Sequence, residues 1–241
     1  HNALLNNILL NADSYKASHF KQYPPNTQVI SSYIEPRGGE FNEVLFFGLQ
    51  AFIKQYLLTP FTQADIDEAT ELYAAHGVPF NREGWQTMFN TYGGFLPLRI
   101  DAVAEGTVLP VKNVLVQVHN TDPAYFWLTS YLETALLRAV WYPSTVATLS
   151  WNAKQIIKAA LEETADNTDG LPFKLHDFGA RGVSSAESAA LGGLAHLVNF
   201  MCTDTVSGLF AARRYYGEPM AGFSIPAAEH RTITSWQRDG E

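Results

Sequence analysis

The sequence has little cysteine, few basic residues and no long hydrophobic run, and each shortage excludes a class of protein. Cys202 is the single cysteine, which excludes an internal disulfide and any metal site built from paired cysteines. Basic residues number 16 against 24 acidic ones, and Arg213 and Arg214 form the only basic doublet. We therefore expect no basic face for nucleic acid. No stretch approaches the roughly 18 apolar residues of a membrane span, and we also expect no membrane partner.

The start of the chain has no run of apolar residues typical of a signal peptide, because Asn, Asp and Lys interrupt it at once. Together with the lone cysteine, this pattern predicts a cytoplasmic protein. The chain of 241 residues is 46% hydrophobic and 17% charged, with a net charge of −8. These values are typical of a globular protein with one large domain or two smaller ones.

The first part of the chain mixes strand and helix patterns. Apolar and polar residues alternate over 96–102 and again over 114–118, which predicts two half-buried strands. Helical periodicity is found over 65–75, 124–140 and 150–161, with a break expected at Pro143. We therefore predict an N-terminal mixed α+β domain over residues 1–148.

From residue 149 on we predict a different, α/β domain, because a pattern of strand, loop and helix repeats. The expected strands are 174–178, 197–201 and 221–225. One helix is expected to begin with Ser184 and Glu187 at the spacing of a capping box, and another to occupy 205–216. Such repeats favour parallel strands, in an open sheet or in a barrel.

Four candidate functional residues fall where the predicted strands end. They are His176, Phe178, Asp204 and His230. In parallel α/β folds, ligands bind beyond the carboxyl ends of the strands, so we expect a site there. Structural alternatives remain open: Asp204 can cap the helix that follows it, His176 can be a hydrogen-bonded core histidine, and His230 can lie in a surface loop.

Two chemistries fit this set of residues. Histidines and aspartates at strand ends can hold a divalent metal, although no HxH or HExxH spacing is present. Alternatively, Phe178 offers a stacking face, Asp204 a hydrogen-bond acceptor and Arg181 a clamp for phosphate. The second set suits a heteroaromatic ring joined to a phosphorylated sugar. Neither GxxxxGK[ST] nor GxGxxG occurs, so nucleotide binding through those loops is not supported.

Nine sequence blocks, in order along the chain, resemble the nicotinate and nicotinamide phosphoribosyltransferase family. They are NADSYK (11–16), HFKQYPP (19–25), FGLQ (47–50), NTDP (120–123), WYP (141–143), HDFGARGVSS (176–185), AHLVNF (195–200), TDT (203–205) and PAAEH (226–230). The resemblance extends over essentially the whole chain and is strongest to the nicotinamide enzymes. It implies that phosphoribosyl pyrophosphate and nicotinamide give nicotinamide mononucleotide and pyrophosphate, a step of NAD salvage.

The resemblance also implies a fold and an assembly. The α+β domain would be followed, over 149–241, by the first βα units of an incomplete (β/α) barrel of the type II phosphoribosyltransferase kind. The remaining barrel would lie outside this chain, because three βα units cannot close an eight-stranded barrel. The expected assembly is a homodimer with active sites at the interface.

Substrate-binding roles follow from the same resemblance. Phe178 would stack on the pyridine ring from one side and Tyr15 of the other subunit from the opposite side. Asp204 would accept a hydrogen bond from the carboxamide. Arg181 would hold phosphate, with Arg37 reaching in from the other subunit.

The remaining roles concern Asp13, His176 and His230. Asp13 lies in the same cross-subunit segment as Tyr15, and His176 belongs to the substrate-binding set. His230 matches the histidine that ATP phosphorylates, so ATP is a further expected substrate and His230 the expected catalytic residue. Mg²⁺ is expected as a companion of phosphoribosyl pyrophosphate and ATP, and no protein ligand for a metal is identified.

Two alternatives to nicotinamide transfer stay open. One is a nicotinate phosphoribosyltransferase, which Asp204 disfavours because its carboxylate would face the like charge of nicotinate. The other is a non-catalytic fragment that acts as a binding or dimerisation module. The length of the natural protein would distinguish this second alternative from an enzyme.

Overall fold

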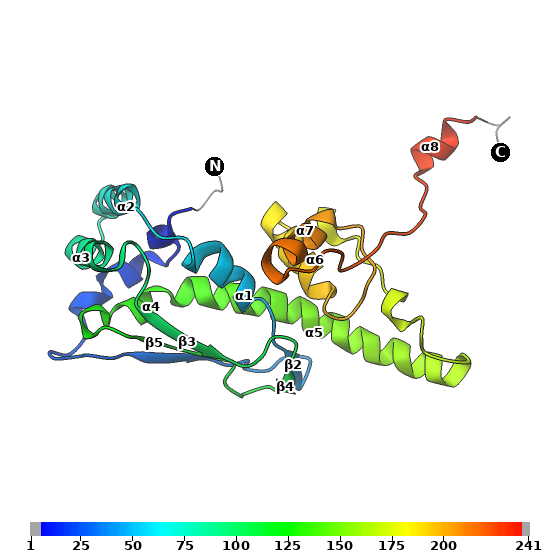
Figure 1. Cartoon of the computed structure of the whole chain (residues 1–241), viewed down its shortest axis with the longest axis horizontal. Helices are drawn as coiled ribbons and strands as arrows, with labels where there is room; N and C mark the ends of the chain where they lie inside the picture. Colours follow the sequence, from blue (N-terminus) through cyan, green and yellow to red (C-terminus); the bar gives the residue numbers. More distant parts are fainter. Residues whose placement is uncertain (1–5, 238–241) are drawn as a thin grey trace. The chain divides into compact units, whose positions relative to one another are not determined.

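The structure is a computed structural model that describes residues 6–237 (Figure 1). It divides into two compact units, residues 1–152 and residues 153–241, and the boundary falls inside one long helix. Helices and strands both occur, which confirms the mixed α/β class predicted from the sequence. The incomplete barrel stays a prediction.

The first unit contains a three-stranded antiparallel sheet in the order β1-β5-β3. Its strands are β1 (Ser31–Ile34), β3 (Leu98–Ala102) and β5 (Val116–Asn120), and β3 and β5 lie side by side in Figure 1. Val116 and Val118 of the central strand are buried, while Gln117 between them is exposed. This alternation is the pattern that predicted both β3 and β5.

A second antiparallel pair joins β2 (Glu43–Leu45) to β4 (Val108–Pro110). Together with β1, these strands were not predicted from the sequence. They have only three or four residues each, so too few positions alternate to give a periodic signal.

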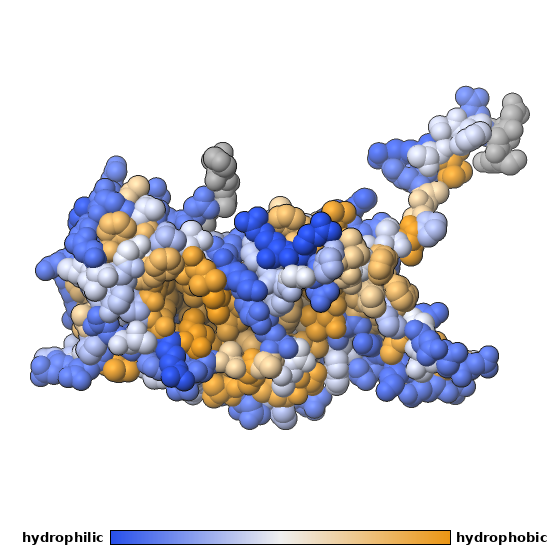
Figure 2. Space-filling view, viewed as in Figure 1, coloured by the Kyte–Doolittle hydropathy of each residue, from blue (hydrophilic) through white to orange (hydrophobic). Residues whose placement is uncertain are grey.

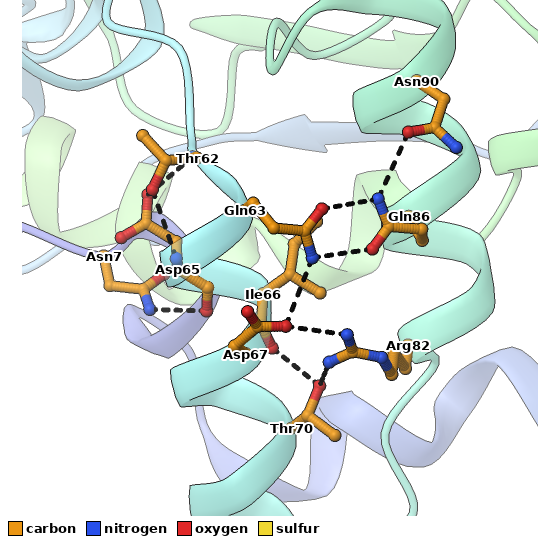
Figure 3. Close-up of polar contacts among 10 residues, drawn as sticks. All are labelled: Asn7, Thr62, Gln63, Asp65, Ile66, Asp67, Thr70, Arg82, Gln86 and Asn90. Atoms are coloured by element: carbon orange, nitrogen blue, oxygen red, sulfur yellow. Dashed lines mark hydrogen bonds and ion pairs between the residues drawn. The ribbon is translucent and has the colours of Figure 1, made fainter.

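Polar side chains join helices α2 (Gln63–His76) and α3 (Arg82–Tyr92) (Figure 3). The amides of Gln63 and Gln86 exchange hydrogen bonds of 2.8 and 2.7 Å. The guanidinium of Arg82 on α3 donates to a carboxylate oxygen of Asp67 on α2 at 2.7 Å. The helix predicted over 65–75 is confirmed as α2.

The core of the first unit is rich in aromatic side chains. Trp85 is fully buried and makes edge-to-face contacts with Phe61, Trp127 and Tyr131, with ring centroids 5.1–5.4 Å apart. Such pairs add to the stabilisation that comes from area burial alone. The shorter helices around this core are Ile8–Leu10, Ser14–Lys21, α1 (Leu49–Phe52), Ile53–Leu57, Pro123–Tyr125 and α4 (Leu128–Tyr131).

Helix α5 (Glu133–Thr164) runs without interruption through Pro143, so the predicted break there is wrong. Pro143 is buried, and its ring lies so close to Gly48 that any side chain at that glycine would collide with it. The next residue, Ser144, accepts from the backbone amide of Phe47 at 3.1 Å. These tertiary contacts offset the hydrogen bond that proline removes from the helix.

The second unit contains α6 (Ala186–His196), α7 (Val206–Tyr216) and α8 (His230–Thr234), as well as the short helices Leu171–Phe173 and Gly179–Arg181. The cap of α6 is Ser185, whose hydroxyl accepts from the backbone amide of Ser188 at 3.1 Å. The N-cap is therefore Ser185 and not Ser184, so the capping box predicted at Ser184 and Glu187 is wrong.

The three strands predicted in this unit do not form as ladders. They are replaced by two isolated parallel bridges, Asp177 with Thr203 and Cys202 with Phe223. The strand predicted over 197–201 is wrong because helical hydrogen bonds persist to Phe200, whose amide donates to His196 at 3.1 Å. Too few residues are left for a ladder, but the predicted parallel direction is kept.

Hydrophobic side chains reach the surface of both units (Figure 2). On α5 these include Leu137 and Trp141, and on α7 Val206 and Phe210. They are available for contacts with other molecules. No helix within residues 6–237 is long and apolar enough to cross a membrane.

Candidate functional site

Three backbone segments of the second unit meet at the isolated bridges and carry the candidate site. The amide of Asp204 donates to the carbonyl of Asp177 at 2.9 Å, and the amide of Thr203 donates to the carbonyl of Phe223 at 3.0 Å. These bonds bring together the residues that directly follow each bridge. The side chains of Ser224 and of His176, the residue before Asp177, consequently both contact the carboxylate of Asp204.

The side chains of Ser224 and His176 both contact the same oxygen of the Asp204 carboxylate. The hydroxyl of Ser224 donates to Oδ1 at 2.6 Å, and Nε2 of His176 lies 2.7 Å from the same atom. The hydrogen bond from Ser224, and then that from His176, lower the pKa of Asp204 below its ordinary value. Asp204 is therefore a carboxylate at neutral pH.

Asp204 does not cap helix α7. The N-cap position is held by Thr205, and no side chain accepts a hydrogen bond from the first turn of the helix. The capping alternative considered for Asp204 is therefore wrong in this structure. The Asp204 carboxylate instead contacts the side chains of His176 and Ser224.

His176 is largely buried, with 13% of its side chain exposed. Its Nδ1 atom has no hydrogen-bond partner within the described residues, whereas Nε2 contacts Asp204. A buried N–H without an acceptor is more costly than a bare ring nitrogen, so we assign the proton to Nε2. The ring lies 4.5 Å from that of Phe178, at an angle of 36°.

An open groove of about 690 Å³ lies beside this cluster. It is lined by Phe178, Ala180, Arg181, Asp204 and Thr205. The Phe178 side chain is 57% exposed and offers a flat aromatic face. The groove therefore combines a stacking surface, a carboxylate and a guanidinium, which suit a flat polar ring attached to an anionic group.

Asp177 shapes the turn that carries Phe178 and Arg181. Its Oδ1 accepts from the backbone amide of Gly179 at 2.7 Å, and its Oδ2 accepts from the hydroxyl of Thr203 at 3.2 Å. A side chain at Gly179 would start 2.9 Å from that same carboxylate. Both carboxylate oxygens of Asp177 thus accept hydrogen bonds that stabilise the turn and the neighbouring segment.

His230 is not brought to this groove. It is the first residue of α8 and is exposed, at the end of an extended segment that leads away from α6 and α7 (Figure 1). Its predicted role as a phosphate acceptor stays a prediction.

The remaining predicted residues belong to the first unit. Asp13 precedes the helix Ser14–Lys21, and its carboxylate accepts a hydrogen bond from the hydroxyl of Thr134. Tyr15 follows at the start of that helix with 57% of its surface exposed, and Arg37 is exposed in the loop after β1. Both Tyr15 and Arg37 are accessible to a second molecule.

Of the contacts that the described residues make with the Asp204 carboxylate, the sequence interpretation missed Ser224. The signal that could have found it is position, because Ser224 lies inside the third predicted strand close to its carboxyl end. Serine is common in loops and turns, so its residue type alone gave no reason to single it out.

The described residues offer no ready metal centre. Among residues 6–237, no group of three His, Cys, Asp or Glu side chains gathers closely enough to hold a metal ion. We therefore derive no chemical step through a metal held by this chain.

Comparisons with known protein families give matches in both units. Residues 7–100 match the family model of the nicotinamide phosphoribosyltransferase N-terminal domain. Residues 173–241 match that of the nicotinate phosphoribosyltransferase family. The second match contains every residue that lines the groove.

Similar proteins match along almost the whole chain. A nicotinamide phosphoribosyltransferase of Xanthomonas campestris pv. campestris is 59% identical over 98% of this chain and 51% of its own length. One from Acinetobacter baylyi is 30% identical over 96% of this chain and 50% of its own length. The chain thus spans about half the length of the curated relatives it matches.

Solved structures of low sequence identity share the fold. Human nicotinic acid phosphoribosyltransferase matches 92% of this chain and 40% of its own, with a TM-score of 0.61 and 18% identity. A nicotinate-nucleotide pyrophosphorylase from Pyrococcus furiosus matches 98% of this chain and 46% of its own, with a TM-score of 0.56 and 17% identity. The two family models and the 59% identical relative show that the chain is similar, in both of its units, to nicotinate and nicotinamide phosphoribosyltransferases.

Proposed function

We propose that the protein containing this chain transfers a phosphoribosyl group from phosphoribosyl pyrophosphate to nicotinamide, giving nicotinamide mononucleotide and pyrophosphate in NAD salvage. The observation that carries the proposal is the groove in which an anionic Asp204 lies beside the exposed ring of Phe178. The names of the relatives from Xanthomonas and Acinetobacter support the same activity.

The groove would bind the pyridine ring through two of its residues. Phe178 would stack on one face of the ring, which requires no hydrogen bond from that face. Asp204 would accept a hydrogen bond from the carboxamide N–H₂, while its carboxylate would repel the like charge of nicotinate. These two interactions would fix the ring nitrogen as the attacking atom and favour the amide over the acid.

Arg181 would hold phosphate at the other part of the groove. The ring nitrogen attacks the anomeric carbon of the ribose, the bond from this carbon to the pyrophosphate oxygen breaks, and pyrophosphate leaves with the bonding electrons. Positive charge develops on the ribose in the transition state, and negative charge on the leaving group. The guanidinium of Arg181 is suited to stabilise the negative charge that develops on the leaving pyrophosphate. Holding both reactants in one groove also lowers the entropic part of the barrier.

We further propose a homodimer in which each active site is shared. Tyr15, Arg37 and Asp13 of one subunit would complete the groove of the other, with Tyr15 on the second face of the pyridine ring. The exposure of Tyr15 and Arg37 supports this assembly. Exposed apolar residues of α5, such as Leu137 and Trp141, provide area for an interface.

His230 is proposed as the residue that receives phosphate from ATP. One imidazole nitrogen would attack the γ-phosphorus, the bond to the β–γ bridging oxygen would break, and ADP would leave. An unprotonated imidazole is a competent nucleophile near neutral pH. Mg²⁺ would accompany the phosphates of both substrates.

The finer architecture and location also belong to this proposal. The two parallel bridges, separated by α6 and α7, support the idea that the second unit is the start of a (β/α) barrel. The predicted cytoplasmic location stays a prediction. The nicotinate enzyme and the non-catalytic module remain alternatives, and the anionic Asp204 in the groove speaks against the first of them.

An assay of the natural full-length protein tests the proposal. Incubated with nicotinamide and phosphoribosyl pyrophosphate, it should form nicotinamide mononucleotide and an equal amount of pyrophosphate. A Phe178→Ala variant should show a KM for nicotinamide raised by up to about tenfold, because aromatic stacking contributes roughly 0.5–1.5 kcal/mol. Product formed only from nicotinate would support the nicotinate alternative, and no product from either base would support the non-catalytic module.

A further inference from the structure

The two oxygens of the Asp204 carboxylate have different surroundings. Oδ1 receives hydrogen bonds from Ser224 at 2.6 Å and from His176 at 2.7 Å. Oδ2 receives none from the part of the chain that the structure describes, and Asp204 lines the groove. Because a carboxylate oxygen accepts about two hydrogen bonds, Oδ1 is filled and Oδ2 is left for a ligand.

The backbone holds the donor from Ser224 in place. The residue before it, Phe223, donates its amide to Met201 at 2.8 Å, and its carbonyl accepts from Thr203 at 3.0 Å. Asp204 directly follows Thr203, so both partners of the side-chain hydrogen bond extend from one backbone junction. The Ser224 hydroxyl therefore approaches the carboxylate from a fixed position and not from a freely moving loop.

His176 holds the same oxygen from another side. Because the buried Nδ1 of His176 has no partner within the described residues, we assign the ring proton to Nε2, which then donates a hydrogen bond to Oδ1 of Asp204. Two donors from two different segments define the plane in which the carboxylate lies. With either donor missing, the carboxylate can rotate about the bond to its Cβ atom.

We propose that Ser224 is a positioning residue for substrate specificity: its hydroxyl, together with His176, holds Oδ1 of Asp204 so that Oδ2 alone is presented to the amide group of a neutral heteroaromatic carboxamide. This inference rests on the proposed function of the groove. It separates two contributions of Asp204. The charge of Asp204 repels the acid, whereas its orientation, set by Ser224, binds the amide.

The two contributions predict different effects of substitution. Removing the hydroxyl of Ser224 leaves the carboxylate charged but free to turn, so the amide loses affinity and the acid gains none. Replacing Asp204 by asparagine removes the charge, so the acid gains affinity. A purely structural role of Ser224 would weaken both ligands together or neither.

Calorimetric titration of the natural full-length protein with nicotinamide and with nicotinate tests the inference. Ser224→Ala should weaken nicotinamide binding by about tenfold, the effect of one lost hydrogen bond to a charged group, and should leave nicotinate binding no tighter. Ser224→Thr, which keeps the hydroxyl, should bind nicotinamide within about threefold of the unsubstituted protein. Ser31→Ala is the matched control, because Ser31 is an exposed serine of the first unit whose hydroxyl accepts a hydrogen bond from the side-chain amide of Gln117.

A second pair of variants keeps the test decisive if Ser224→Ala folds poorly. Threonine and valine have nearly the same shape, so a loss of nicotinamide binding in Ser224→Val but not in Ser224→Thr comes from the hydroxyl alone. Equal binding of nicotinamide by these two variants, or by Ser224→Ala and Ser31→Ala, would overturn the inference. The Asp204→Asn variant distinguishes a failure of this inference from a failure of the proposed function. If it too leaves the preference for nicotinamide over nicotinate unchanged, the proposed recognition of the carboxamide by Asp204 is wrong as well.

Discussion

Gly208 packs directly against Gly193, so that helices α6 and α7 meet backbone to backbone. A Cβ atom placed on Gly208 would lie 2.9 Å from the carbonyl carbon of Gly193, and one placed on Gly193 would lie 3.2 Å from Cα of Gly208. A side chain added at Gly208 would therefore require a backbone shift, and one added at Gly193 would have to push its neighbours aside by a few tenths of an ångström. Since Thr205 and Asp204 directly precede α7, this contact also fixes one wall of the groove.

Gly208→Ala should therefore destabilise the protein. Overpacking of this kind costs about 1–3 kcal/mol, because the neighbouring atoms are backbone and cannot rotate away. Gly39→Ala is the matched control, since no atom lies within 4 Å of the added methyl group. Urea denaturation of both variants checks the prediction. Equal urea midpoints for the two variants would show that α6 and α7 can move apart without loss of folding free energy.

A pH dependence of stability should arise from His196. This side chain is 6% exposed, contacts the carbonyl of Leu175 at 3.0 Å and stacks on Phe200. Burial holds the pKa of His196 below its ordinary value. The unfolded chain therefore binds a proton more readily, and stability falls as the pH drops below about 6.5, by at most about 1.4 kcal/mol per pH unit.

His196→Gln should remove this component, because glutamine has no titrating group in that range. The measurement is the free energy of unfolding at pH 7.5 and pH 5.5, compared with His76→Gln, which replaces an exposed histidine. The pKa of Asp204 is lowered by its hydrogen bonds, so this carboxylate does not titrate within the window. If the His196→Gln variant and the unsubstituted protein show the same pH dependence of stability, that dependence arises from other groups.

The shared active site can be tested by mixing two inactive variants. Tyr15→Ala and Asp204→Ala damage residues from different subunits of the proposed site. Coexpressed, they should form some dimers with one intact site, and about a quarter of the activity should return if subunits pair at random. Single-variant preparations mixed after purification serve as the control for exchange. Coexpressed variants as inactive as each alone would exclude a shared site.

The proposed phosphorylation of His230 predicts a modified protein. With ATP present, the natural protein should carry an acid-labile, base-stable phosphate, and His230→Ala should lack both this label and the stimulation by ATP. Transfer without ATP should survive in part, because Phe178 and Arg181 are unchanged. His76→Ala is the control. Undiminished labelling of the His230→Ala protein would rule this residue out as the acceptor.

The sequence predicted those elements whose local pattern agrees with their final packing. Helix α2 has its own caps, at Thr62 and Gly77, and β3 has its own alternation, so both were found. The break at Pro143 was wrong because its outcome depends on contacts with Phe47 and Gly48, which lie far away in the sequence. Tertiary packing decided that position, and no local pattern could reveal it.

The candidate site could be predicted in position but not in detail. Residue type and expected strand ends indicated His176, Phe178 and Asp204, because ligands of parallel α/β folds bind beyond the carboxyl ends of the strands. The partner Ser224 and the free oxygen of Asp204 follow only from the crossing of backbone segments at the bridges. The strand ladders themselves were overestimated, since β-branched and aromatic runs also occur where a single bridge forms.

The most direct test of the account is a competition between nicotinamide and nicotinate, offered at equal concentration with phosphoribosyl pyrophosphate to the natural full-length protein. We predict that the product is almost entirely the amide nucleotide, and that Asp204→Asn shifts the ratio toward the acid nucleotide by at least about fivefold, the effect of two like charges at contact distance in water. Asp166→Asn, which removes an exposed charge from the same unit, should leave the ratio unchanged. An Asp204→Asn protein with the ratio of the unsubstituted one would contradict the claim that this carboxylate selects the substrate.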